Sequence, residues 1–82
     1  MDKKKQIEFL EEMLKNAYLG RLQTEVGRRR LLSLTLSSRG KEAELLNGKL
    51  GDEKRKQEEL DGLIRVIKGL LNEIKEGSFK LE

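Results

Sequence analysis

The second half of the chain carries the most regular hydrophobic pattern. From residue 43 to residue 74, selected positions alternate at spacings of three and four, and most of them are apolar. This alternation is typical of a coiled-coil seam, the narrow stripe that one helix buries against another. The seam positions are Ala43, Leu46, Leu50, Glu53, Gln57, Leu60, Ile64, Ile67, Leu71 and Ile74. The pattern predicts a long helix over about residues 41–76, ending at Gly77 in a C-capping role.

Two polar residues, Glu53 and Gln57, interrupt this seam shortly after Gly48 and Gly51. Asp52 could cap a new helix after a turn at the two glycines. Alternatively, one helix runs through and exposes a solvated polar patch in mid-seam. The three-four spacing keeps its phase across the interruption, which favours the continuous helix.

Near the C-terminal end, Leu63, Val66 and Leu70 widen the apolar stripe beyond the seam. A stripe of this width indicates burial against more than one neighbouring helix, as in a bundle. We therefore expect this end to be the main partner surface.

The first half carries a second apolar face. After Asp2, a plausible N-cap, apolar residues recur at spacings of three and four: Ile7, Leu10, Met13, Leu14, Ala17 and Tyr18. Leu22 and Val26 then follow at spacings of four, which rotates the stripe around the helix. Gly20 and Gly27 each weaken a helix by about 1 kcal/mol relative to Ala. The sequence therefore predicts a bend or a change of packing partner near these glycines.

The segment Leu31–Ser38 alternates leucines with hydroxyl residues, which is a strand pattern when it is read alone. Leu32 and Leu36 also lie one helical turn apart, and no second strand is available for pairing, so helix is favoured over strand. Ser37–Gly40 is the best turn candidate and separates two arms of equal length.

These patterns predict an all-α fold with a single domain over residues 1–82. Its arms cover about residues 3–38 and 41–76, its turn about 37–41, and its tail 77–82. The arms form an antiparallel helical hairpin with a coiled-coil seam, and two hairpins are expected to assemble into a dimeric four-helix bundle. In this scheme the second-arm seam packs on the first arm, at Ile7, Leu10, Leu14, Tyr18, Leu22 and Val26.

Composition narrows the function classes. Charged residues make up 40% of the 82 residues and hydrophobic residues 35%, which suits long helices better than a thick globular core. The chain has no His and no Cys and carries no nucleotide-binding or metalloprotease motif, so we expect no enzyme activity, cofactor, metal or small-molecule substrate. No stretch is long and apolar enough for a signal or membrane segment, and we expect a cytoplasmic protein.

The joint absence of Pro, Cys, His and Trp is unusual for a natural chain. It fits either a specialised coiled-coil protein or an engineered sequence. Leu81-Glu82 looks like a cloning-site remnant, and we leave it out of the fold prediction.

Basic residues gather in the first half as a candidate anion or nucleic-acid patch: Arg21, Arg28, Arg29, Arg30 and Arg39. Such a patch can bind phosphate groups, but no aromatic residue lies within it to stack on bases. The alternative is structural, because the first arm is basic and the second is slightly acidic. Complementary charge would then favour antiparallel pairing of the arms, and we prefer this interpretation.

Two short segments resemble known families. The run Glu59–Ile67 looks like the C-terminal helix of the small co-chaperones for type III secretion needle proteins, which are helical hairpins, and this implies sequestering a partner's helix. Ile7-Glu8 together with Gln57–Asp61 is similar to the helix signatures of the sporulation aspartyl-phosphate phosphatases, which implies that Asp61 would address a response regulator. Both resemblances cover short stretches, so we assign the chain to neither family.

The leading hypothesis is a non-enzymatic helical interaction module, an adaptor, chaperone or assembly factor, that binds itself as a homodimer or binds a helical partner. The alternatives are a small nucleic-acid-binding protein that uses Arg28–Arg30 and a regulatory modulator that uses Asp61. The residues expected at the partner interface are apolar and lie in the second arm: Leu46, Leu50, Leu60, Leu63, Ile64, Ile67, Leu70, Leu71 and Ile74.

Overall fold

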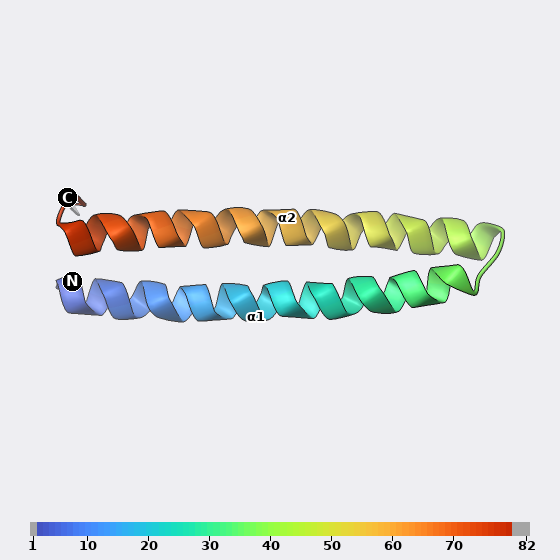
Figure 1. The fold of residues 1–82 in the computed structure, drawn as a ribbon, viewed down its shortest axis with the longest axis horizontal. Coiled ribbons are helices and arrows are strands. Elements are labelled where there is room, and N and C mark those ends of the chain that lie inside the picture. The colour runs from blue at the N-terminus through green and yellow to red at the C-terminus, as the bar shows by residue number, and fades with distance from the viewer. Residues whose placement is uncertain (1, 80–82) are drawn as a thin grey trace.

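The computed structural model describes residues 2–79. Two long helices contain nearly all of these residues and lie antiparallel along their whole length (Figure 1). Helix α1 spans Lys3–Leu36 and helix α2 spans Lys41–Glu76, and a short turn joins them at the end opposite both termini. The hairpin measures 56 × 16 × 16 Å. Residues 1 and 80–82 lie outside the described part, and with them the predicted cloning remnant Leu81-Glu82.

The ends of the helices follow the capping rules. The Asp2 side chain accepts a hydrogen bond from the Lys5 backbone N–H at 2.8 Å, as its position before the first apolar stripe predicts. Gly77 ends α2 in the left-handed region at φ 80°, and its N–H donates to the Ile74 carbonyl oxygen at 3.1 Å. In the turn, Gly40 has φ 67° and ψ −136°, a conformation that is essentially reserved for glycine.

The structure confirms a hairpin of two helices and resolves both open alternatives. Helix α1 continues through Leu31 to Leu36, so the alternating leucines are helical. Helix α2 runs through Gly48 and Gly51 without a break. Among the described residues, neither helix has a stretch that is long and apolar enough to cross a membrane.

The core is a single line of side chains between the helices, concentrated toward the termini. Its buried apolar members come from both helices: Leu10, Ala17, Ile64, Ile67, Leu71 and Ile74. Ile67 is the most buried, with 2% of its surface exposed. Every predicted α2 seam position is buried or half-buried, so the three-four pattern marks the face of α2 that packs on α1.

The predicted course of the α1 stripe is wrong after Ala17. Leu22 and Val26 are 63% and 64% exposed, and Tyr18 is also exposed. A straight line of contact with α2 requires the three-four alternation to continue, and from Ala17 it leads to Arg21, Thr24, Arg28 and Leu31, which are all buried or half-buried. The stripe therefore keeps its course and becomes polar.

The predicted bend or change of partner at Gly20 and Gly27 is also wrong. Helix α1 continues through both residues, and both lie against α2. A Cβ atom on Gly20 would lie 3.5 Å from the Leu60 side chain, and one on Gly27 would lie 3.3 Å from the Glu53 carboxylate. The two glycines leave room for α2 side chains, and the pairs Gly20–Leu60 and Gly27–Glu53 define the antiparallel register.

Candidate functional site

The middle of the hairpin holds a polar cluster centred on Glu25. Its Oε1 accepts hydrogen bonds from Arg28 Nη2 and Arg29 Nε, both at 2.9 Å. Its Oε2 accepts from Gln57 Nε2 on α2 at 2.8 Å and from Arg21 Nη1 at 3.4 Å. The hydrogen bond from Arg28, followed by those from Arg29 and Gln57, lowers the pKa of Glu25 to about 2. This carboxylate therefore stays charged at any ordinary pH.

The cluster satisfies the polar groups that enter the core. Gln57 is 7% exposed and donates to Glu25, while the Thr24 hydroxyl, also buried, donates to the Arg21 carbonyl oxygen at 2.7 Å. Within residues 2–79 no buried side-chain nitrogen or oxygen lacks a partner. The mid-seam interruption was predicted to be solvated. At Gln57 that is wrong, because the amide is buried and reaches a carboxylate on the other helix.

Most arginines of the predicted basic patch form ion pairs within this cluster. Arg28 and Arg29 form ion pairs with Glu25, and Arg21 pairs with both Glu25 and Asp61. Within the described range, Arg30 and Arg39 are exposed and have no ion-pair partner.

Asp61, the carboxylate of the third hypothesis, lies at the edge of the same cluster. It accepts a hydrogen bond from Arg21 Nε at 2.9 Å, and half of its side chain is exposed. An acid that acted on a partner would have to leave this ion pair. No group of three or more metal-binding side chains occurs in the described part of the chain.

The predicted interface residues separate into two groups. Seven pack toward α1 inside the hairpin: Leu46, Leu50, Leu60, Ile64, Ile67, Leu71 and Ile74. Leu63 is 41% exposed, Val66 beside it is 68% exposed, and Leu70 is partly exposed. This second group, at spacings of three and four, forms a stripe beside the seam.

On one flank of the hairpin, the α1 side lacks charge over about half of its length. On α1, six uncharged residues recur at spacings of four and three, and over about 18 residues they extend for about 27 Å. They are Phe9, Met13, Asn16, Gly20, Gln23 and Gly27. Gly20, Gln23 and Gly27 line one groove together with Leu63 of α2, which places both stripes on the same side. We call these six residues, with Leu63, Val66 and Leu70, the uncharged flank.

The groove in this flank has a volume of about 640 Å³. The groove exists because positions 20 and 27, which face this flank, are glycines and place no side chains there. Its α2 wall carries Leu60 and Leu63 at one end and charged residues toward the turn. The groove is a shallow, partly apolar channel that suits an inserted side chain better than a small polar ligand.

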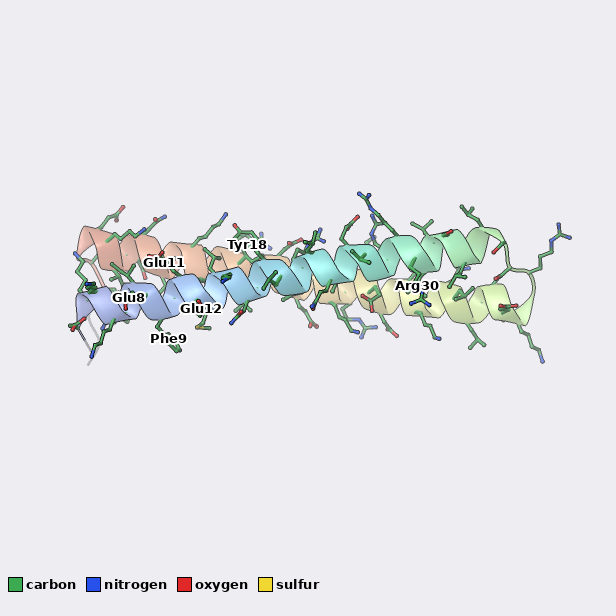
Figure 2. All side chains as sticks on the ribbon, turned by 90° about the horizontal axis from the view of Figure 1, so that it is seen from below. Glu8, Phe9, Glu11, Glu12, Tyr18 and Arg30 are labelled. Carbon is green, nitrogen blue, oxygen red and sulfur yellow. The ribbon has the colours of Figure 1, made fainter. Side chains whose placement is uncertain are left out.

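The opposite flank is polar. Lys68 Nζ lies 5.4 Å from the centre of the Tyr18 ring, and the Arg21–Asp61 ion pair follows along the same side. Figure 2 shows Phe9 and Tyr18 projecting from opposite sides of α1. The hairpin thus has one flank with charged contacts between its helices, and one flank with an uncharged α1 stripe and exposed apolar side chains.

Sequence reasoning missed Phe9, Gly20, Gln23 and Gly27 as surface residues and Glu25 as the centre of the polar cluster. The uncharged α1 stripe is visible in the sequence as a four-three spacing without charge, in a chain that is 40% charged. Joining it to Leu63, Val66 and Leu70 requires the register of the two helices, which the pattern alone does not provide.

Comparison of the chain with protein-family models, curated proteins and solved structures gave no significant match.

Proposed function

We propose that this chain is a non-enzymatic helical interaction module, an adaptor, chaperone or assembly factor, which binds another helical surface through its uncharged flank. The observation that carries the proposal is the contrast between the flanks: exposed Phe9, Leu63 and Val66 share one side, on which the charged residues of the groove, Lys56 and Glu59, lie toward the turn. Contiguous exposed apolar surface marks interaction sites on soluble proteins.

The proposal moves the binding surface away from the seam. Ile64, Ile67 and Leu71 pack inside the hairpin, as coiled-coil positions would, and are unavailable to a partner unless the helices separate. The stripe of Leu63, Val66 and Leu70 is available without unfolding. It lies at the end of α2 where the sequence predicts contact with more than one helix. We also retain a cytoplasmic location as part of the proposal.

The same geometry weighs against the alternatives. Phosphate groups would have to displace Glu25 from Arg28 and Arg29 before those side chains could bind them. A reaction at Asp61 would have to release Arg21. We therefore propose neither nucleic-acid binding nor a catalytic carboxylate as the main role.

The test uses a photoreactive benzophenone amino acid in place of Val66, with Glu58 as the control position. Glu58 is exposed on α2 one turn from Asp61, on the opposite flank. Irradiation in cells that make the chain should give discrete adducts from position 66 and few from position 58. Equal yields of adducts from both positions, or none from position 66, would contradict the proposal.

A further inference from the structure

We infer that the uncharged flank is covered by a second copy of this chain, related by a two-fold axis along the length of the hairpin. Both turns then lie at the same end, and α1 of each copy faces α2 of the other. This inference rests on the proposed function and specifies its partner.

The first argument is the thin core of the single hairpin. In the described residues only six apolar side chains are buried, and no large side chain is completely enclosed. Chains of this size rarely obtain adequate stability from one such layer and often gain the missing core by association. The exposed apolar side chains of the uncharged flank would form the second layer of the core.

The second argument is size and shape. The hairpin is 56 Å long and 16 Å wide, so the whole side that contains the uncharged flank presents a footprint of about 900 Å². A standard stable interface buries about 800 Å² on each partner. A single helix about 10 Å across would leave part of this width uncovered. A second hairpin has the length and width to cover all of it.

The third argument selects the orientation. A rotation about an axis along the length does not shift residues along the hairpin. Each α1 residue therefore faces, in the second copy, the same α2 residues that lie beside it in its own chain. Gly20 lies against Leu60 and lines the groove with Leu63, so Leu63 of the second copy lies over Gly20 and fills the groove. Phe9 and Met13 likewise meet the stripe around Leu70 of the second copy.

Charge supports the same orientation. The flank of α2 carries charge toward the turn, at Asp52, Lys56 and Glu59, whereas the α1 flank is uncharged as far as Gly27. With α1 over α2, Arg30 comes level with Asp52 of the second copy, and Lys56 and Glu59 lie over Gly20, Gln23 and Gly27 instead of over large apolar side chains. The Lys56 ammonium is already paired with Glu53 at 3.3 Å.

The reverse orientation, with the turns at opposite ends, stacks α2 on α2 and α1 on α1. With the two hairpins fully overlapped, it brings Asp52 of one copy over Val66 of the other, and Arg30 over Phe9. That arrangement desolvates charges against apolar side chains without providing them with partners.

The first experiment is sedimentation equilibrium of the full chain and of two matched variants, Leu63→Glu and Leu22→Glu. Both positions are exposed in the hairpin, but only Leu63 lies on the uncharged flank. The wild type should show twice the 9.5 kDa chain mass. Leu63→Glu should weaken association roughly a hundredfold, as loss of a central contact does, and Leu22→Glu should change it less than threefold.

Helical circular dichroism confirms that each variant stays folded, and Val66→Glu is the second flank variant if Leu63→Glu unfolds. A wild-type mass of 9.5 kDa at high concentration overturns the inference. Equal dissociation by Leu63→Glu and Leu22→Glu overturns it as well. A monomer that still gives adducts from position 66 with another protein removes the second copy but leaves the proposed function standing. A monomer without adducts removes both.

The second experiment tests the orientation with a spin label on Arg39→Cys, in a chain that has no other cysteine. Arg39 is exposed in the turn. The inferred dimer places the two labels at one end, no farther apart than about twice the 16 Å width. A separation near the 56 Å length would show the reverse orientation and overturn the arrangement.

Discussion

Replacing Ile67 with Ala tests whether the line of side chains between the helices supplies the stability of the fold. Ile67 is 2% exposed, the lowest value among the core residues. The change removes three carbon atoms, worth about 0.8 kcal/mol each in lost burial, and the cavity left behind adds to the loss. Alanine regains a few tenths of a kcal/mol in helix propensity. We expect a net destabilisation of about 2–4 kcal/mol.

The assay is urea or thermal unfolding followed by helical circular dichroism, with Val26→Ala as the control at the same chain concentration. Val26 is 64% exposed on the side of α1 away from α2, so its truncation should cost less than about 0.5 kcal/mol. For a chain of this size, 1 kcal/mol corresponds to about 4–8 °C in Tm. Ile67→Ala should therefore lower Tm by at least about 8 °C. Equal shifts for the two variants would refute the hairpin register.

Three further predictions follow from local geometry. The pKa of Glu25 is lowered from 4.5 to about 2 on folding, so its contribution to the stability of the fold is complete above pH 4.5 and is lost as the pH falls toward 2. Between pH 4.5 and 2, the Tm of Glu25→Gln should therefore fall less than that of the wild type. Parallel curves of Tm against pH would contradict this. Gly40→Ala should destabilise the fold by about 1–2 kcal/mol, because Gly40 has a positive φ. Gly48 lies in an exposed helical position with open space around it, so Gly48→Ala should stabilise the fold by about 1 kcal/mol. Chemical denaturation measures both changes, and a loss of stability in Gly48→Ala would contradict the continuous helix. Glu25→Gln should also release Arg28 and Arg29 and raise the salt concentration at which the chain elutes from a heparin column, and unchanged elution would show that the arginines are not held by Glu25.

The hydrophobic pattern was sufficient to predict α2 and its packing face. Leu60, Ile64, Ile67 and Leu71 keep one three-four phase with Glu53 and Gln57, and a continuous phase across Gly48 and Gly51 is difficult to reconcile with a turn. Backbone periodicity carries this information directly, because residues three and four apart lie on one face of a helix.

The same reasoning failed on α1 because it assumed that the face packed against α2 is apolar along the whole helix. Leu22 and Val26 are apolar and exposed, whereas Arg21 and Thr24 face α2. A polar residue is tolerated on the contact line when a partner satisfies it, and here the partners of α1 include Gln57 and Asp61 on the other helix. Those partners are about 30 to 40 residues away in sequence and become neighbours only through the register.

The uncharged flank shows the same limit. Each of its stripes can be recognised in the sequence, but neither is wide enough alone to indicate a binding surface. The register brings the Gly20–Gly27 hollow beside Leu63, and this juxtaposition converts two weak stripes into one candidate interface.

A dilution series followed by methyl NMR tests most directly whether the uncharged flank is the binding surface. Between millimolar and low micromolar concentrations, we expect methyl shifts to change at Met13, Leu63 and Val66, because these groups leave a second copy on dilution. The methyl groups of Leu22 and Val26 should stay constant. Changes confined to Leu22 and Val26, or no concentration dependence at any methyl group, would contradict a dimer formed through this flank.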